Sequence, residues 1–297
     1  MLPAPFSREF LNRLEVLRLK TRKDVLGSNP GSHTGARRGH SLEFADYRKY
    51  APGDDLRYLD WGVLARTDRL YVKLFREEVD LCVYLFLDAS GSMLFPSRAE
   101  KFARAGHLAL ALAYAVLANN DIVRFHLMEH QTNGRSSPYY RGRSRIMDAA
   151  RFIDGVTPTG PLDMATGIQQ HLQRIRRPGK AIVISDFLME PEHYERGLKL
   201  LKGSNFDVTL LQVLSRAEID PPFKEGGLIV QENETQAEIR LQWTDEVRRQ
   251  YGAALERRRQ SLRSFCHRTS IDASAYVTDE DLADYVLKIL PGIGLFQ

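Results

Sequence analysis

The feature that most constrains the fold is an apolar run, residues 81–87, that ends abruptly in Asp88-Ala-Ser-Gly-Ser92. An unbroken apolar run of this length is typical of a strand buried on both faces, as in a parallel sheet covered by helices. Polar residues directly after such a strand lie at its carboxyl end, where open α/β sheets place their binding sites. Asp88, Ser90 and Ser92 offer one carboxylate and two hydroxyls, which are hard oxygen ligands suited to Mg²⁺. The pattern therefore favours binding through a metal ion over covalent chemistry.

Strands and helices are predicted to alternate along the rest of the chain, which favours an α/β class with a doubly wound, mostly parallel sheet. A hairpin embellishment is expected at residues 227–242, and a second hairpin is expected to join strand 70–75 to strand 81–88. An amphipathic helix is expected over residues 7–25 and a mobile, glycine-rich loop over 27–40. The other predicted strands are 121–128, 181–185, 206–213 and 271–276, and the helices are 97–119, 144–154, 162–175, 191–202, 244–268 and 279–290.

A second acidic residue accompanies the first at the end of another predicted strand. Residues 181–185 form an apolar strand that leads into Asp186. Because neighbouring parallel strands end at the same edge of a sheet, Asp88 and Asp186 are expected to share one crevice. The alternative is that Asp88 and Ser90 only cap the turn that follows, since Asp and Ser are favoured there.

Residues 38–66 form an unusual block in which acids alternate with arginines and aromatic side chains. One interpretation is a carboxylate-rich catalytic or binding loop. The other is a salt-bridged segment that holds itself onto the main domain, and the balanced charges favour such self-pairing because arginine binds carboxylates bidentately. The acids of the block are Glu43, Asp46, Asp54, Asp55 and Asp60, and they are interleaved with Arg48, Arg57 and Arg66.

Bulk properties narrow the function classes. The N-terminus lacks a secretory signal, the longest apolar run is too short to span a bilayer, and two cysteines make no disulfide framework. Cytoplasmic residence is expected, at most peripheral to a membrane. The net charge of +4 and the pI near 9.0 admit nucleic-acid binding, but no recognition motif accompanies the charge, so nucleic acid is not expected as a partner.

Enzyme classes find little support. The chain has no phosphate-binding G-x-x-x-x-G-K-[ST] loop, no dinucleotide-binding glycine motif and no G-x-S-x-G elbow. An aspartyl phosphatase would need a second acid two residues after Asp88, where Ser90 stands. The eight histidines are scattered, and a zinc pair of His126 and His130 is not expected because that segment is predicted to be a strand. A metal-dependent phosphoester hydrolase that uses the same acids remains the alternative function.

Two sets of residues resemble a known family. Asp88-Ala-Ser-Gly-Ser92 is similar to the metal-ion-dependent adhesion site (MIDAS) motif of von Willebrand factor A domains. The upstream strings resemble a bacterial family that carries a von Willebrand A-like domain and is catalogued as domain of unknown function fifty-eight. The resemblance runs from about Arg38 to the C-terminus. The upstream strings are Glu43-Phe44-Ala45-Asp46-Tyr47-Arg48, Gly53-Asp54-Asp55-x-Arg57, Asp60-Trp61 and Ala65-Arg66.

The resemblance implies a von Willebrand A-like sheet and a non-enzymatic role in protein interaction. Genes of this family commonly lie beside those for MoxR-type AAA+ ATPases, so the implied partners are such an ATPase and an unidentified client. An adaptor or co-chaperone in complex maturation or stress response is expected. The implied metal ligands are Asp88, Ser90, Ser92 and Asp186, holding Mg²⁺, with Mn²⁺ or Ca²⁺ as alternatives, and a carboxylate of the partner would complete the coordination.

One position departs from the family pattern. The loop that should carry a ligating threonine aligns with residues 160–164, which places Leu162 at that position. Leucine has no ligand atom, so Thr159 is the remaining candidate, and weak occupancy is expected. The predicted domains are residues 1–79, with the helix, the loop and the family-specific segment, and residues 80–297, the von Willebrand A-like domain.

Overall fold

The structure, a computed structural model, describes residues 5–21, 42–77, 81–96, 100–130, 134–231 and 237–296. The chain divides into two compact units. The core unit consists of Met1–Lys23 and Leu81–Gln297, and the second unit consists of Asp24–Asp80. The sequence-based division placed all of residues 1–79 together, whereas the N-terminal residues pack with the core unit. Loop 27–40 lies outside the described residues.

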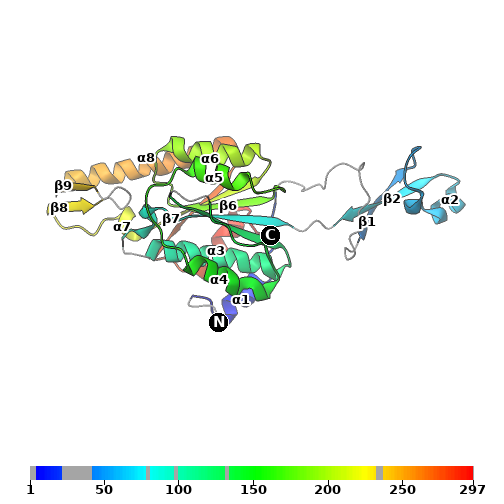
Figure 1. Ribbon diagram of the computed structural model, residues 1–297, viewed down its shortest axis with the longest axis horizontal. Helices are drawn as coiled ribbons and strands as arrows, with labels where there is room; N and C mark the ends of the chain where they lie inside the picture. The colour runs from blue at the N-terminus through cyan, green and yellow to red at the C-terminus, as the bar shows by residue number, and fades with distance from the viewer. Residues whose placement is uncertain are drawn as a thin grey trace. The chain divides into compact units, whose positions relative to one another are not determined.

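The core unit is built on one six-stranded sheet (Figure 1). The strand order is β10-β7-β6-β3-β4-β5, and all neighbours are parallel except the short edge strand β5, which is antiparallel to β4. This confirms the predicted doubly wound α/β class, and it is consistent with a von Willebrand A-like sheet. The strands are β3 (Cys82–Asp88), β4 (Ile122–Met128), β5 (Tyr140–Arg141), β6 (Lys180–Ser185), β7 (Asp207–Leu214) and β10 (Asp272–Val277).

The strand order reverses at the centre of the sheet. β3 pairs with β4 on one side and with β6 on the other, although β6 is separated from β3 by two further strands in the sequence. A crevice opens outside the carboxyl ends of the strands at such a switch point, because the connections leave on opposite sides. Asp88 and Asp186 both stand at this point.

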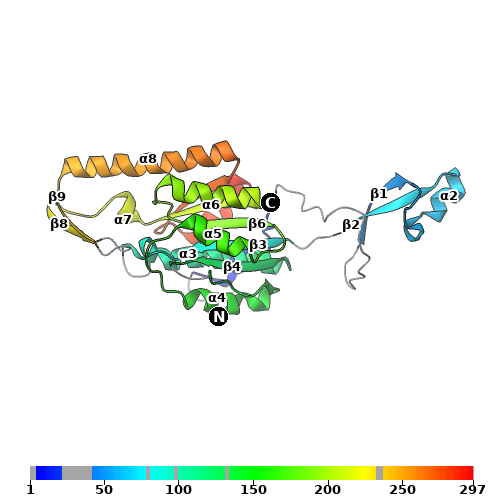
Figure 2. The same cartoon turned by 45° about the horizontal axis from the view of Figure 1, so that its top comes forward.

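Helices cover both faces of the sheet (Figures 1 and 2). One face carries α1 (Arg8–Leu14), α3 (Glu100–Ala118), α4 (Ile146–Asp154) and the C-terminal turns α9 (Leu282–Asp284), η4 (Tyr285–Ile289) and η5 (Leu290–Ile293). The other carries α5 (Met164–Leu172), α6 (Pro191–Gly203) and α8 (Asp245–Thr269).

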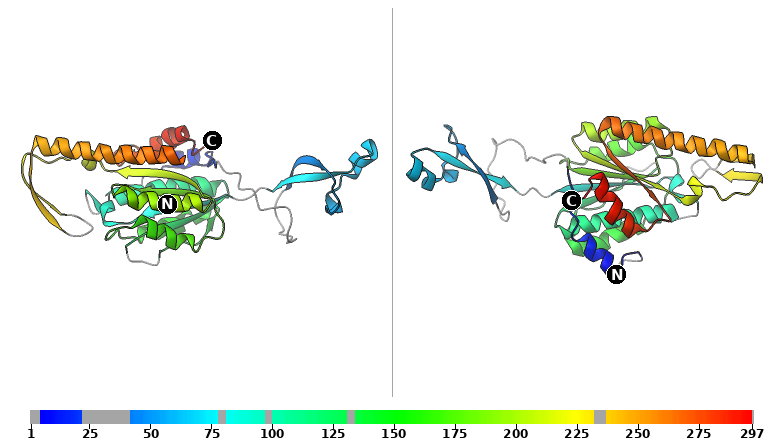
Figure 3. Two further views of the ribbon diagram at one scale, coloured as in Figure 1. Left: turned by 90° about the horizontal axis from the view of Figure 1, so that it is seen from above. Right: turned by 180° about the vertical axis from the view of Figure 1, so that it is seen from behind.

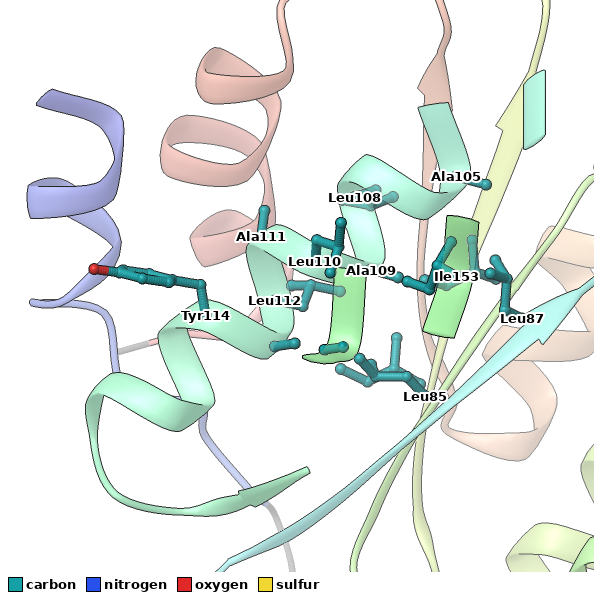
Figure 4. Packing of buried hydrophobic residues seen from close by; sticks show 14 of the residues in the cluster. Leu85, Leu87, Ala105, Leu108, Ala109, Leu110, Ala111, Leu112, Tyr114 and Ile153 are labelled. Atoms are coloured by element: carbon teal, nitrogen blue, oxygen red, sulfur yellow. The ribbon is translucent and has the colours of Figure 1, made fainter. Parts of the chain in front are cut away.

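Alternate residues of β3 contribute to the two cores. Val83, Leu85 and Leu87 belong to the cluster under α3, and the residues between them belong to the cluster under α5 and α6. Figure 4 shows Leu85 and Leu87 beside α3 and Ile153. Both faces of β3 are therefore apolar because both are covered, which explains the unbroken run in the sequence.

The predicted helix 7–25 was too long. α1 ends at Leu14, a turn follows at residues 15–16, and Leu19 then bridges to Phe296, while residues 22–25 of the prediction lie outside the described residues. Leu17 and Leu19 pack against the core while Val16 is exposed. This two-residue alternation is the pattern of an extended segment. Figure 3 shows α1 and the C-terminal turns on the same side of the core unit.

The predicted hairpin between strand 70–75 and strand 81–88 was also wrong. β2 (Tyr71–Glu77) pairs antiparallel with β1 (Leu42–Lys49) in the second unit, while β3 is a central strand of the core sheet. The second unit also contains η1 (Leu56–Tyr58) and α2 (Trp61–Thr67), whose N-cap is Asp60. The block that looked irregular in sequence is thus a bulged hairpin with a capped helix.

The predicted hairpin at 227–242 is present as β8 (Gly226–Gln231) and β9 (Glu238–Trp243). It follows the short helix α7 (Arg216–Ile219) and precedes α8 (Figure 1). Val230 is paired with Ile239 in register, and both side chains are exposed. Within the described part of the chain, helices of the length and hydropathy needed to cross a bilayer do not occur.

Candidate functional site

Asp88 ends β3 and is completely buried. Its Oδ1 accepts a hydrogen bond from the Ser90 backbone N–H at 2.8 Å, and its Oδ2 accepts one from the Ser185 hydroxyl at 2.5 Å. Ser185 is the last residue of β6, so this bond joins the two strands of the switch point. Burial, followed by the like charge of Asp186, raises the pKa of Asp88 to about 6.

The two serines of the motif lie at the start of η2 (Gly91–Leu94). Their hydroxyl oxygens are 3.0 Å apart. A hydrogen bond from the Ser92 hydroxyl to the Asp186 carboxylate also helps to lower the pKa of Asp186. Asp88, Ser90, Ser92 and Asp186 are therefore brought together, as the sequence predicted. Asp88 also caps the turn through the Ser90 N–H, as the capping interpretation expects, whereas the Ser90 side chain makes no capping hydrogen bond to η2.

A buried lysine that the sequence reasoning missed completes the cluster. Lys101, near the start of α3, donates hydrogen bonds to Asp186 Oδ2 at 2.7 Å and to Glu218 Oε1 at 2.5 Å. Its side chain is fully buried. Glu218 lies in α7 and forms a reciprocal capping box with Ser215. Nothing in the local pattern around Lys101 or Glu218 marks them, because each is recognisable only by its distant partners.

The charges of this cluster partly compensate one another. Burial opposes the ionised form of each group, but Lys101 holds the pKa of Asp186 below its usual value, and the two carboxylates hold the pKa of Lys101 above its usual value. Burial and the charge of Asp186 raise the pKa of Glu218. Asp186 and Lys101 thus form an ion pair, while Asp88 is held by N–H and O–H donors.

An open cavity of about 710 Å³ lies over this cluster. Ser92, Asp186 and Glu218 stand in its wall. The remaining lining residues come from the segments after η2, β4, α4 and β6, from α6, from the hairpin and from α8: Phe95, His130, Pro161, Leu162, Asp163, Leu188, Met189, Glu190, His193, Gln231 and Arg258. The lining of the cavity combines apolar side chains with the charged side chains of the cluster. Such a lining suits a peptide segment or side chain that has both apolar and polar parts.

The loop at 159–163 borders the site through its backbone. Gly91 N–H donates to Gly160 O at 2.8 Å, and Thr159 N–H donates to Ala89 O at 3.0 Å. Gly160 has a φ of +62°, and a Cβ there would lie 2.7 Å from the His130 ring, so glycine is required at this position.

The two residues that could replace the expected threonine differ in placement. Leu162 lines the cavity and packs against the core under α5. The Thr159 side chain is exposed and is not among the described residues that line the cavity. The prediction of Thr159 as a ligand has no contact in its favour, and Leu162 offers the cavity an apolar side chain without a ligand atom.

The donor set fits a weak cation site. Among the described residues, no three His, Cys, Asp or Glu side chains gather around one point, so a high-affinity transition-metal site is not formed. The cluster does offer two carboxylates and two hydroxyls as oxygen ligands. This set is suited to Mg²⁺, which proteins bind through one or two carboxylates and several waters. Asp88, Ser90, Ser92 and Asp186 would hold such an ion.

Three acids of the second unit form ion pairs with basic side chains of the same unit. Asp54 pairs with Arg48 at 2.8 Å, Asp55 with Arg57 at 2.5 Å, and Asp60 with Lys73 at 3.1 Å. Asp60 also accepts a hydrogen bond from Tyr47, which lowers its pKa to about 2. These side chains therefore pair with one another, which is the self-pairing part of the second interpretation, and the bonds hold the unit together internally. The side chain of Glu43 lies outside the described set.

A second buried polar cluster lies under β4. His126 Nδ1 and His171 Nδ1 are 3.0 Å apart, and the Ser136 hydroxyl is 2.9 Å from the first and 3.2 Å from the second. Since His171 Nε2 lies 2.9 Å from the Leu127 carbonyl, it carries the proton and its Nδ1 accepts. Both rings are therefore neutral, and burial lowers both pKa values, that of His126 to about 2.

Comparison with known proteins identifies relatives along most of the chain. A family model described as "Protein of unknown function DUF58" matches residues 46–261. Uncharacterized proteins of Mycobacterium bovis and Mycobacterium tuberculosis are each 30% identical over 230 residues, which cover 75% of this chain and 70% of theirs.

Several solved structures share part of the architecture. The conserved hypothetical protein BatB from Bacteroides thetaiotaomicron aligns with a TM-score of 0.43 and 14% identity, covering 72% of this chain and 98% of that one. A von Willebrand factor type A protein from Catenulispora acidiphila aligns with a TM-score of 0.41 and 14% identity, covering 75% of this chain and 44% of that one. Because these scores are low, the fold assignment rests on the strand order.

Proposed function

Because this chain belongs to the family of proteins of unknown function DUF58, we propose a function that its own site supports: a non-enzymatic protein-interaction module. Its cavity takes a weakly held divalent cation, Mg²⁺ or alternatively Mn²⁺ or Ca²⁺, at Asp88, Ser90, Ser92 and Asp186. The ion supplies an open coordination position, and an acidic side chain of a partner protein binds there.

The observation that carries this proposal is the state of Asp88. A buried carboxylate costs free energy unless it is paired with a cation or well hydrogen-bonded. Asp88 is fully buried, its hydrogen bonds come from the Ser90 N–H and the Ser185 hydroxyl, and its charged neighbour Asp186 repels it. An added cation at this point would relieve that repulsion.

The surface beside the cavity supports a protein partner. Gln231, at the end of β8, lines the cavity, so the hairpin borders it. The cross-strand pair Val230 and Ile239 is exposed on this hairpin, as is Ile229. Exposed aliphatic side chains next to a polar cavity are typical of protein–protein interfaces.

The cation is tested by calorimetric titration of Mg²⁺ into the wild type and into Asp88→Asn. Asparagine keeps the acceptor for the Ser90 N–H but removes the charge, so we expect the binding heat to be lost. The matched control is Asp163→Asn. Asp163 also lines the cavity but serves as the N-cap of α5, a role that asparagine fills equally well. Equal heats for wild type and Asp88→Asn would refute a cation at Asp88.

A gain of function is expected for Leu162→Thr. The substitution places a hydroxyl at the cavity wall and removes apolar packing, so Mg²⁺ should bind several-fold more tightly while stability falls by about 1 kcal/mol. Calorimetry measures the first effect and urea unfolding the second. Leu162→Val is the control, since it keeps the branched shape without an oxygen atom and should leave the affinity unchanged.

The partner we propose is a MoxR-type AAA+ ATPase, with an unidentified client, in an adaptor or co-chaperone role. The purified ATPase of the same organism should co-elute with this protein in size-exclusion chromatography when Mg²⁺ is present. Co-elution should weaken for Asp88→Asn and for Val230→Lys. Separate elution of the wild-type proteins at micromolar concentration would argue against this partner.

The proposal includes the absence of catalysis. Both oxygens of Asp88 accept hydrogen bonds from within the strand ends, so its carboxylate is poorly placed to attack a phosphoester. We expect no Mg²⁺-dependent turnover of a generic phosphoester such as p-nitrophenyl phosphate. Turnover that disappears in Asp88→Asn would instead favour the phosphoester hydrolase.

A further inference from the structure

Lys101 is a buried cation in direct contact with the acids of the candidate site. Its ammonium is fully buried and donates to Asp186 and to Glu218. Asp186 is at the same time a proposed ligand of the divalent cation. The cluster therefore combines three carboxyl groups, those of Asp88, Asp186 and Glu218, with a single ammonium.

The contacts of Lys101 join three elements at the carboxyl edge of the sheet. Lys101 belongs to α3, Asp186 follows β6, and Glu218 belongs to α7. Glu218 is held in turn by Ser215, whose N–H and hydroxyl both donate to it. The ammonium is thus fixed in place, because its partners are themselves fixed.

We propose that Lys101 is a built-in counter-ion of this site and sets its cation affinity. It neutralises Asp186 when no metal is bound, so the cluster folds without one, and its charge repels a divalent ion that approaches the same carboxylate. The site consequently binds a cation weakly and depends on a partner's carboxylate for full coordination. This inference rests on the proposed function and identifies the residue that tunes it.

The decisive variant is Lys101→Met, which keeps the length of the side chain and removes its charge. Asp186 and Glu218 are then left without their cation, and a divalent ion becomes the means of compensating them. We expect Mg²⁺ and Mn²⁺ to bind about tenfold or more tightly, because a fixed like charge near the ion has been removed. The melting temperature of Lys101→Met should also rise with added Mg²⁺ far more than that of the wild type.

A second buried lysine provides the matched control. Lys180, the first residue of β6, pairs with Asp207 at 2.9 Å and is as buried as Lys101. It lies at the opposite end of the same strand from Asp186. Lys180→Met should also destabilise the protein, but added Mg²⁺ should neither bind more tightly nor restore its melting temperature.

If Lys101→Met does not fold without metal, a second variant provides the test. The double substitution Lys101→Met with Glu218→Gln removes one charge of each sign and leaves Asp186 as the only carboxylate that lost its partner. It should fold more readily and still bind Mg²⁺ more tightly than the wild type. Unchanged affinity in the folded variants, together with a melting temperature that Mg²⁺ does not raise, would overturn the role of Lys101.

The outcomes separate this inference from the proposed function. If the wild type binds no cation while Lys101→Met does, the lysine replaces the metal, so the inference holds and the metal-dependent function fails. If the wild type binds Mg²⁺ through Asp88 and Lys101→Met binds it no better, the function stands and the inference fails. If neither protein binds a cation, both are refuted.

Discussion

The contribution of His126 to the free energy of unfolding is expected to fall by about 2 kcal/mol between pH 7 and pH 5. Burial lowers its pKa in the folded protein from 6.5 to about 2. The unfolded chain therefore binds a proton below pH 6.5 that the folded protein refuses, so stability is complete above that pH and is lost progressively as the pH falls. At pH 5 the pH lies about 1.5 units below the pKa of 6.5 in the unfolded chain, and each unit corresponds to about 1.4 kcal/mol. His171, whose pKa is also lowered, acts in the same direction.

Urea unfolding at both pH values measures this effect. The comparison is with His126→Phe, which keeps an aromatic ring against Phe86, the residue on which His126 stacks. Asp88 acts in the opposite direction because its pKa is raised, so the difference between wild type and variant isolates His126. His267→Gln, at an exposed position near the end of α8, should behave like the wild type. Parallel pH profiles for wild type and His126→Phe would contradict the prediction.

Gly179→Ala is expected to destabilise the protein by about 3 kcal/mol or more. A Cβ at this buried position would lie 2.1 Å from the carbonyl oxygen of Cys82, the first residue of β3. The obstacle is backbone, and Cys82 is held in the central ladder by its pairing with Ile122 of β4. Relief therefore requires the sheet to move, which costs more than the shift of a flexible side chain.

The control for this substitution is Gly203→Ala. Gly203 is the last residue of α6, and a Cβ there would meet nothing within 4 Å. Alanine is favoured over glycine in a helix, so stability should be unchanged or slightly higher. Thermal and urea unfolding of both variants give the comparison, and a Gly179→Ala protein as stable as the wild type would show that the strand ends can separate without cost.

The sheet could be predicted because the apolar composition of its central strands indicates that both of their faces are buried. β3 and β6 are apolar at almost every position, since helices cover both faces, and this pattern appears in the sequence without reference to any other segment. Alternation with helices then predicts a parallel, doubly wound order. The same reasoning failed for β2, because an alternating strand of moderate polarity does not specify its partner, and nearness in sequence suggested β3 where β1 was correct.

Asp88, Ser90, Ser92 and Asp186 were also accessible from the sequence, because polar residues at the ends of parallel strands converge wherever the sheet is formed. Lys101, Glu218 and the pair of His126 with His171 were not. Lys101 lies 85 residues from Asp186 and 117 from Glu218 in the sequence, so no local pattern links them. An isolated lysine at the start of a helix is expected to be exposed to solvent.

The sequence by itself thus determined the buried central strands, the doubly wound class and which polar residues meet at the switch point. Each of these depends on local periodicity and on the direction of the chain. Only the tertiary structure decided which charge accompanies the acids of the site. A buried ammonium and a neutral histidine pair owe their states to partners brought from distant segments, and to the cost of burying a charge that has none.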